Sequence, residues 1–425
     1  MPRLIYTLVV LLLLPWAVLH LLWRARRQKE YLQHWGERFA RYDDSARGLP
    51  TIWLHAVSVG ETRAAQPLVT ALRQRYPDHR ILFTHMTPTG RATSEALYGD
   101  SVERIYLPYD TPWAMRRFLR HFRPRLGLIM ETELWPNMVA ACRDESVPLL
   151  LLNARLSERS AQRYARFPAL SGEALHGLTA IGAQSVDDAG RLQALGAANV
   201  TVTGNLKFDI EAATRQLELG SELRQRYGAR TSWLAASTRE GEETLILDAW
   251  RRARRGDMAL VGATAVPLLV IVPRHPQRFA EVARLASERG FRVQSRSEGS
   301  AVGIDTDVLI GDSMGEMFAY YASVDLAFIG GSLLDFGSQN LIEAAACGTA
   351  ILIGPSTRNF ADAARAAIEC GAARSIVDAD DLTRQALALL RDEATRAAMG
   401  RAGRDFAARH RGATARTMAL IPAAR

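Results

Sequence analysis

Short apolar segments recur along the chain and show little alternation between polar and apolar residues. Such segments are typical of parallel strands buried on both faces, and helical patterns such as 64–76 and 113–122 separate several of them. Strands that alternate with helices restrict the chain to α/β folds with parallel sheets. A first series of predicted strands covers 51–55, 81–84, 102–107, 126–130, 149–153, 178–183 and 200–203, and a second covers 232–236, 268–272, 291–294, 308–310, 326–329 and 350–353.

The two series of strands predict two doubly wound, Rossmann-like domains that face a cleft. The chain has 425 residues, which is enough for two domains of ordinary size. A polar stretch without strands, 209–230, connects the two series, and the residues after 380 are typical of helices rich in alanine and arginine. We therefore expect domains at 28–210 and 211–425, preceded by a separate segment at 1–27.

That N-terminal segment is predicted to be a membrane anchor. Residues 4–23 form a nearly unbroken apolar run of about the length that spans a bilayer. Four basic residues between 24 and 29 follow the run, whereas only Arg3 precedes it, which predicts that the rest of the chain is cytoplasmic. A cleaved signal peptide is the alternative, but arginines stand where its small-residue cleavage site would lie. A helix that lies in the membrane interface is the main variant of the anchor.

The overall charge points to an anionic partner. The formal net charge is +8, and the chain contains no zinc-finger or RNP-type aromatic motif, so an anionic membrane surface is favoured over nucleic acid. The cysteines Cys142, Cys347 and Cys370 are widely spaced and form no CxxC motif. This spacing is typical of a reducing compartment and argues against both a disulfide framework and a zinc site.

The first strand leads directly to a candidate catalytic carboxylate. Residues 51–55 run into a Ser58-Val59-Gly60 turn, and a helix opens at Glu61. The carboxyl ends of parallel strands border ligand sites, and the free N–H groups of a helix start point outward there. The Glu61 carboxylate either only stabilises the helix dipole or acts as a general base, for which desolvation has to raise its pKa.

Two further segments in the first series carry charged residues at strand ends. Glu131 and Glu133 follow the strand 126–130 and share one face of an extended segment, so both can enter the cleft, and a solvated loop is the alternative. Lys207 follows the strand 200–203 and can neutralise a developing negative charge, or it is a surface charge. Because only Lys29 and Lys207 are lysines among 53 basic residues, the functional role of Lys207 is favoured.

The second series carries turns that suit a phosphate group. Each turn follows a strand and offers main-chain N–H groups or hydroxyls to an anion, and together they predict a nucleotide site. Glu343 lies one turn into the helix after Asn340 and is placed to accept hydrogen bonds from ribose hydroxyls, with pairing to an arginine as the alternative. The turns are 237–243, 273–276, 311–316 and 330–332.

Several common enzyme motifs are missing from the sequence. There is no GxxxxGK[ST], no GxGxxG after a strand, no HExxH and no GxSxG. Their absence disfavours kinase-like enzymes, dehydrogenases, zincins and α/β-hydrolases.

Taken together, these residues resemble the Kdo transferase family, membrane-bound glycosyltransferases that add 3-deoxy-D-manno-octulosonic acid (Kdo) to lipid A precursors. The resemblance covers almost the whole chain, and its motifs stand in family order and spacing. They lie at 55–61, 86–90, 131–137, 153–157, 204–209, 272–276, 311–316 and 330–333.

The resemblance implies a GT-B fold, a CMP-Kdo donor and inverting transfer to a glucosamine hydroxyl of lipid IVA at the cytoplasmic face of the inner membrane. It implies that Glu61 is the general base and that Glu131 and Lys207 stabilise the transition state. It also implies a set of CMP contacts, which are Pro273, Arg274, Met314, Gly315, Glu316, Asn340, Leu341, Ile342 and Glu343.

No cofactor is implied, and no DxD-like metal motif stands at a suitable strand end. We therefore expect protein groups to hold the leaving phosphate: Arg274, the main-chain N–H groups of 311–316, and the hydroxyls of Ser237 and Thr238.

The chain departs from the family pattern at two positions. Gln339 stands where the family commonly has the histidine of Gly-Gly-His-Asn, and Ser356 stands where it has another histidine. Glutamine cannot carry a proton or a positive charge, so the roles of those histidines do not transfer. The alternatives to Kdo transfer are another GT-B nucleotide-sugar glycosyltransferase that acts on a membrane lipid, and a non-catalytic binding protein tethered to the membrane.

Overall fold

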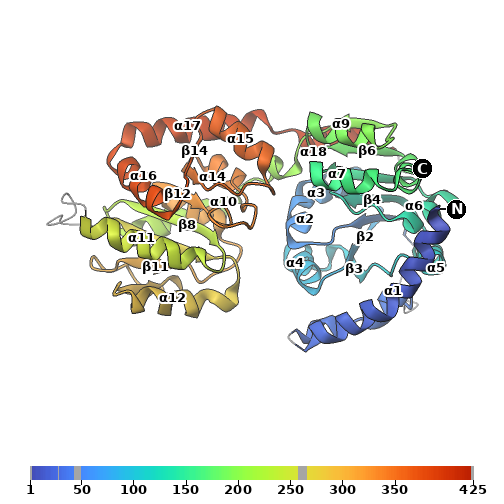
Figure 1. Cartoon of the computed structure of the whole chain (residues 1–425), viewed down its shortest axis with the longest axis horizontal. Coiled ribbons are helices and arrows are strands. Elements are labelled where there is room, and N and C mark those ends of the chain that lie inside the picture. The colour runs from blue at the N-terminus through green and yellow to red at the C-terminus, as the bar shows by residue number, and fades with distance from the viewer. Residues whose placement is uncertain (1, 27, 43–48, 257–265, 423–425) are drawn as a thin grey trace. The chain divides into compact units, whose positions relative to one another are not determined.

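The computed structural model describes residues 2–26, 28–42, 49–256 and 266–422. By their mutual contacts the residues group into two units, Met1–Ile210 with Arg411–Arg425, and Glu211–His410 (Figure 1). The predicted anchor and domains end at or near residues that lie outside the described ranges, namely Met1, Arg27 and 423–425.

The first unit is built on a parallel seven-stranded sheet in the order β3-β2-β1-β4-β5-β6-β7. The order reverses between β1 and β4, and His55 at the end of β1 pairs in register with Thr84 on β2 and Ile129 on β4. The ends of these three strands therefore meet at one edge. The strands are β1 (Thr51–His55), β2 (Arg80–His85), β3 (Glu103–Tyr106), β4 (Pro124–Met130), β5 (Leu149–Ala154), β6 (Ala180–Ala183) and β7 (Val200–Val202).

Both faces of this sheet are covered by helices, as continuous apolar strands require. Trp53 belongs to one apolar cluster and its neighbours Ile52 and Leu54 to another, because successive side chains of a strand point to opposite faces. The helices are α2 (Val59–Ala64), α3 (Gln66–Arg75), α4 (Pro88–Tyr98), α5 (Pro112–Phe122), α6 (Pro136–Asp144), α7 (Glu158–Ala165), α8 (Pro168–His176) and α9 (Val186–Ala194).

The second unit repeats this architecture with the strand order β10-β11-β9-β8-β12-β13-β14, again parallel. The strands are β8 (Ser232–Thr238), β9 (Leu268–Pro273), β10 (Val293–Ser295), β11 (Val308–Ile310), β12 (Leu326–Ile329), β13 (Ala350–Ile353) and β14 (Ala373–Ser375). The helices are α10 (Thr214–Tyr227), α11 (Glu242–Gly256), α12 (Phe279–Glu288), α13 (Met317–Ser323), α14 (Ile342–Cys347), α15 (Ala361–Glu369), α16 (Ala379–Arg391) and α17 (Glu393–Arg409).

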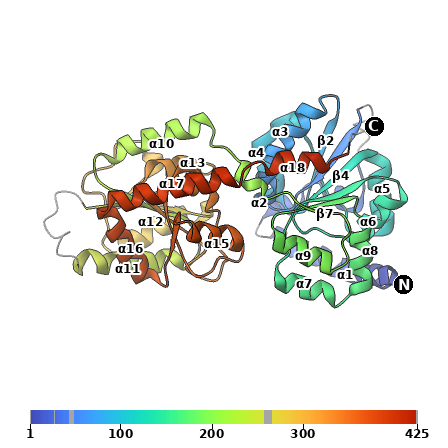
Figure 2. The same cartoon turned by 90° about the horizontal axis from the view of Figure 1, so that it is seen from above.

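The predicted α/β class with two parallel sheets is confirmed. Strand β14 was not predicted, because only one of its three residues is buried and it lacks an apolar run. By their contacts the units divide after Ile210, and the C-terminal helix groups with the first of them. Helix α18 (Ala413–Leu420) was assigned to the second domain, whereas it packs on the first unit beside α3 (Figure 2).

Polar bonds explain the position of α18. The Asp209 carboxylate accepts a hydrogen bond from the main-chain N–H of Gly412 at 2.7 Å, just before the helix begins. Arg416 donates from Nε to the Thr203 carbonyl at 2.8 Å, and Arg75 donates to the Met418 carbonyl at 2.7 Å. These bonds attach the helix to the ends of β7 and α3. Such contacts between residues far apart in the sequence cannot be predicted from a composition rich in alanine and arginine.

The N-terminal apolar segment forms one helix, α1 (Pro2–Ala25), with a mean hydropathy of 2.3. It contacts α6, α8 and the 3₁₀ turn η1 (Lys29–Leu32), and most of its large apolar side chains are exposed. By length and composition it is the one described helix able to cross a membrane.

Candidate active site

Glu61 is held at the junction of β1 and α2 by the turn that precedes it. Ser58 is the N-cap of α2, and its Oγ accepts a hydrogen bond from the Glu61 N–H at 3.2 Å. In return Ser58 Oγ donates to Glu61 Oε1 at 2.7 Å, and the Val57 N–H donates to Oε2 at 2.8 Å. The Ser-x-x-Glu spacing thus folds the carboxyl group back over the strand end, in the manner of a capping box.

The environment of Glu61 raises its pKa to about 7. Burial of the carboxyl group is the largest cause, and the negative charge of Glu131 is the second; the bonds from Val57 and Ser58 act in the opposite direction. Glu61 is only 8% exposed. A carboxylate with a pKa near neutrality is basic enough to take a proton from a hydroxyl as that hydroxyl becomes acidic during reaction.

Glu131 and Lys207 come together from β4 and β7, although 76 positions separate them. Glu131 follows β4 directly with a φ of +59°, an uncommon conformation for a residue other than glycine. Lys207 lies in the 3₁₀ turn η4 (Leu206–Asp209), whose N-cap Asn205 accepts from the Lys207 N–H. Lys207 Nζ lies 3.1 Å from Glu131 Oε1, and both side chains are about 15% exposed, so the pair is partly shielded from water.

Glu133 lies on the same segment but is bound locally. Trp135 donates from its indole N–H to Glu133 Oε2 at 2.9 Å, and burial raises the pKa of Glu133. Its charge contributes only a minor increase to the pKa of Glu61. The structure therefore brings Glu61, Glu131 and Lys207 to one place, with Glu133 at its edge.

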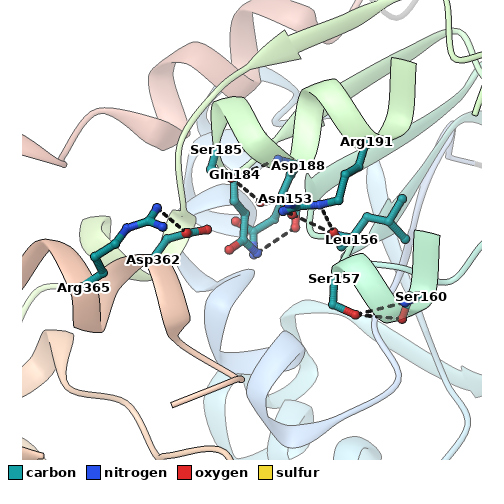
Figure 3. A network of polar contacts seen from close by, with 10 residues as sticks. All are labelled: Asn153, Leu156, Ser157, Ser160, Gln184, Ser185, Asp188, Arg191, Asp362 and Arg365. Atoms are coloured by element: carbon teal, nitrogen blue, oxygen red, sulfur yellow. Dashed lines mark hydrogen bonds and ion pairs between the residues drawn. The ribbon is translucent and has the colours of Figure 1, made fainter. Parts of the chain in front are cut away.

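A polar network that the sequence analysis did not assign supports these strand ends (Figure 3). Asn153, at the end of β5, adopts a φ of +53° and accepts from the Leu206 N–H at 3.0 Å, which fixes the turn that carries Lys207. Asp188 of α9 accepts from the Leu156 N–H at 2.8 Å and from Ser185 Oγ at 2.6 Å. The 153–157 motif was the sequence signal that could have indicated this network. A buried asparagine tolerates the left-handed conformation and commonly binds the main chain of a neighbouring turn.

The hydroxyls at the end of β8 in the second unit do not lie as expected. Thr238 is fully buried and donates to Glu243 Oε1 at 2.9 Å, while Glu243 Oε2 pairs with Arg278 at 3.1 Å. A phosphate cannot reach the Thr238 hydroxyl in this arrangement. Ser237, with a φ of +54°, is half-buried, and its Oγ contacts the sulfur of Met317 at 3.7 Å.

The glycine-rich turn after β12 is occupied by a side chain of the same unit. Glu242 is fully buried, and its Oε2 accepts from the N–H groups of Arg239 at 2.8 Å and Gly331 at 2.7 Å. Its Oε1 accepts from the N–H of Leu333 at 3.0 Å. The N–H of Gly331, which belongs to the turn predicted to bind phosphate, therefore binds an internal carboxylate, as does the N–H of the neighbouring Leu333.

The loop after β11 remains partly open. Met314 is 50% exposed, and Gly315 has a φ of +80° with open space around it. Glu316 is bound to Arg296 at 3.0 Å and accepts from Ser313 Oγ at 2.6 Å, so its carboxylate shapes the loop. These contacts leave the loop main chain near Gly315 as the exposed part of the predicted phosphate site.

The remaining residues that were predicted to contact CMP lie at strand ends or helix starts. Pro273 is the buried last residue of β9, and the Arg274 N–H donates to the Thr238 carbonyl at 2.9 Å. Asn340 donates from Nδ2 to Glu343 Oε1 at 2.9 Å and accepts from the Ile342 N–H at 3.0 Å. Leu341 and Ile342 are buried and contribute to the core, whereas Glu343 is half-buried at the start of α14.

Arg239 and Arg274 add positive charge to this part of the second unit, beside His275. Arg239 lies 3.0 Å from His275 Nε2 and stacks on the Phe336 ring at 4.7 Å. Burial and the charges of Arg239 and Arg274 lower the pKa of His275, so it is neutral at pH 7. Within the described ranges, no three His, Cys, Asp or Glu side chains gather as ligands for a metal ion.

Comparison with known proteins decides the family. Residues 33–210 match the family model described as 3-Deoxy-D-manno-octulosonic-acid transferase (kdotransferase). The 3-deoxy-D-manno-octulosonic acid transferase of Bordetella pertussis is 44% identical, covering 98% of each chain. That of Haemophilus influenzae is 36% identical, covering 99% of this chain and 98% of its own. The chain belongs to the Kdo transferase family. It is accordingly a glycosyltransferase that transfers Kdo.

Solved structures agree on the fold of this Kdo transferase. Anabaena Alr3699/HepE in complex with UDP aligns with a TM-score of 0.56 at 13% identity, over 88% of this chain and 98% of its own. A glycosyltransferase from Rickettsia africae gives a TM-score of 0.56 at 12% identity, over 85% and 94% of the two chains. The two Rossmann-like units are those of a GT-B glycosyltransferase, as predicted.

Proposed function

We propose that the enzyme moves Kdo from CMP-Kdo to the glucosamine disaccharide of lipid IVA in lipopolysaccharide biosynthesis, with Glu61 as general base. The observation that carries this proposal is the Glu61 carboxyl group, buried at the end of β1 with its pKa raised to about 7. A side chain that only capped a helix would gain nothing from a raised pKa, because the helix dipole favours the charged form.

In the proposed single displacement, Glu61 takes the proton from the acceptor hydroxyl as the oxygen attacks the anomeric carbon of Kdo. The bond from that carbon to the CMP phosphate breaks, and CMP leaves from the opposite face. The proton moves to a carboxyl group whose pKa already favours protonation near neutral pH. Lys207 and Glu131 form a preorganised charged pair next to Glu61, where they stabilise charge that develops during the transfer.

The donor is assigned to the second unit. Arg274, the main chain around Gly315, and Asn340 with Glu343 are the proposed contacts for phosphate and ribose. Glu343 accepts a hydrogen bond from Asn340 at 2.9 Å and is half-buried, and a carboxylate at this place suits a hydrogen bond to a vicinal diol. Ser237 replaces Thr238 as the hydroxyl available to phosphate.

Helix α1 supports attachment to the inner membrane, with the catalytic units on the cytoplasmic side. It presents exposed Leu12 and Trp16 and is followed by basic residues. On α5, Arg116 and Arg120 pair with Asp144 and Glu145 at 3.2 and 2.9 Å and remain 48% and 68% exposed. This basic face suits the phosphates of an anionic lipid surface.

The test is the Glu61→Gln variant, assayed with CMP-Kdo and lipid IVA. Glutamine keeps the size of the side chain but cannot accept a proton, so we expect turnover to fall by roughly 10²–10⁴-fold. CMP binding, measured by calorimetry, should stay within about twofold because the donor contacts lie in the second unit. Full turnover by Glu61→Gln would show that Glu61 is not the general base. Transfer from a UDP-sugar but not from CMP-Kdo would show that the proposed donor is wrong.

A further inference from the structure

An apolar groove in the first unit is not used by the catalytic groups. It lies between the N-terminal half of α1 and helices α7 and α8 and has a volume of about 840 Å³. This size falls within the range of small-molecule binding sites. Ile5 and Val9 of α1 and Phe167 at the start of α8 line it and are 62%, 45% and 66% exposed. Exposed apolar side chains around a concave surface mark a site for an apolar ligand.

Helix α1 is fixed as one wall of this groove by polar bonds from its first two turns. Tyr6 donates its hydroxyl hydrogen to Asp110 Oδ2 at 2.9 Å, and Thr7 Oγ1 donates to Asn137 Oδ1 at 3.1 Å. Asp110 is buried and also accepts from the N–H groups of Asn137 at 3.1 Å and Met138 at 2.8 Å. The bonding partners of α1 are therefore themselves held in place.

These bonds are incompatible with a helix that spans the bilayer. The 24 residues of α1 measure about 36 Å, so in a spanning helix Tyr6 would lie on the opposite side of the hydrocarbon core from Asp110. With Tyr6 on Asp110, α1 lies along the membrane surface instead. Its exposed side chains, including Leu8 and Leu12, then reach the bilayer and make the groove continuous with it.

The inner end of the groove leads toward the candidate catalytic residues. Leu134 and Tyr164 line the groove and also line a smaller pocket, whose lining includes Glu131 and Thr132. At the groove itself Arg163 is the one charged lining side chain among the described residues. A hydrocarbon chain with an anionic head group matches this combination of apolar walls and a single cation.

We propose that the groove between α1 and α8 binds one acyl chain of the acceptor lipid and so brings its sugar head group to Glu61. This proposal rests on the proposed function, because it takes the acceptor to be an acylated sugar. The chain enters from the bilayer along Ile5 and Val9 and ends near Leu134, next to the segment that carries Glu131. Acylation is then a positioning determinant of the acceptor as well as a membrane tether.

The first experiment fills the groove from its rim. Ala169 of α8 is exposed and lines the groove, so Ala169→Trp places an indole in it without disturbing the core. Gln162→Trp on α7 adds the same side chain at an exposed position that does not line the groove. We expect Ala169→Trp to raise KM for lipid IVA roughly tenfold, about 1.4 kcal/mol, with KM for CMP-Kdo unchanged. Gln162→Trp should match the wild type.

The same three proteins are assayed with the fully deacylated disaccharide acceptor. We expect Ala169→Trp and the wild type to transfer Kdo to it at equal rates, since no chain occupies the groove. An equal loss on both acceptors, or no loss on either, overturns the groove proposal. A wild-type enzyme that transfers no Kdo from CMP-Kdo to lipid IVA overturns the proposed function instead.

A second measurement does not depend on turnover. A lipid IVA analogue with a diazirine in one acyl chain is irradiated with the wild-type enzyme, and the modified peptides are identified by mass spectrometry. Adducts on 167–174 together with 5–9 support the groove, and Ala169→Trp should reduce them. Adducts confined to 11–23 would place the chain in the bilayer beside α1 and overturn the proposal.

Discussion

The two units share a topology but differ in what their carboxylates do at the strand ends. In the first unit, Glu61 accepts hydrogen bonds from Val57 and Ser58 of the turn that precedes it, and Glu131 pairs with Lys207, which is itself partly exposed. In the second unit, Glu242 and Glu243 are fully buried and saturated by main-chain N–H groups, a threonine and an arginine. Carboxylates with spare bonding capacity are available for chemistry, whereas saturated ones hold the turns that carry a binding surface.

The largest effect that sharpens this comparison is expected from Glu242→Gln. Glutamine offers one acceptor oxygen and turns an NH₂ group toward N–H donors, so the bonds from Gly331 and Leu333 cannot both survive. We expect a loss of about 3 kcal/mol in the free energy of unfolding, since each bond to a buried charge is worth about 1.5–3 kcal/mol. Denaturation followed by circular dichroism measures it.

The matched control for that variant is Glu240→Gln, two positions earlier and exposed. It should change stability by less than about 0.5 kcal/mol. If Glu242→Gln and Glu240→Gln melted alike, the buried carboxylate would not be the element that holds the turn, and the contrast between the units would fail.

The next effect is the pH dependence of the free energy of unfolding that Glu61 causes. In the folded protein its pKa is about 7 against an ordinary value of 4.5, so the folded state holds the proton more tightly than the unfolded state. Stability from this group is therefore fully present below pH 4.5 and is lost as pH rises through 7. Glu61→Gln cannot titrate and should be more stable than wild type by of order 1–3 kcal/mol at pH 8, with no difference near pH 4.5.

Unfolding free energies of both proteins across this pH range provide the measurement. The activity of the wild type should rise with pH through about 7, where the base becomes unprotonated. A gap between the two proteins that stayed constant from pH 4.5 to pH 8 would mean that Glu61 keeps an ordinary pKa and lacks the basicity proposed for it.

Strands other than β14, and the position of Glu61 at the end of β1, could be predicted because their signals are local. The run 51–55 and the Ser-x-x-Glu turn each act within a few positions. The extended segment expected after β4 does not form, because Glu131 is left-handed and Glu133 is bound to Trp135. Long-range bonds could not be read in this way. Glu242 binds the N–H groups of Gly331 and Leu333 across 89 and 91 positions, and these contacts make a predicted phosphate turn into an internal support. In the same way, no local sequence pattern predicts that α18 packs on α3 or that Tyr6 donates a hydrogen bond to Asp110.

The last comparison is between two ion pairs of equal length. Lys207 to Glu131 and Arg278 to Glu243 both measure 3.1 Å, but the first pair is about 15% exposed on each side, whereas Glu243 is fully buried. We expect Lys207→Met to lower kcat by roughly a hundredfold, because a cation aimed at developing charge is worth about 2.7–4 kcal/mol. KM for CMP-Kdo and the melting temperature should change little, since a partly hydrated Glu131 tolerates the loss.

Arg278→Met should have the opposite effects. It leaves the buried Glu243 carboxylate without its cation, which lowers stability by about 3 kcal/mol. The kcat of the remaining folded enzyme should stay near that of the wild type. Lys207→Arg separates charge from position, because it restores the positive charge with a planar group of different reach; partial recovery of kcat would show that Lys207 acts through its charge. If both Met variants lost stability and neither lost kcat selectively, the two pairs would be equivalent supports, and Lys207 would have no part in the transfer.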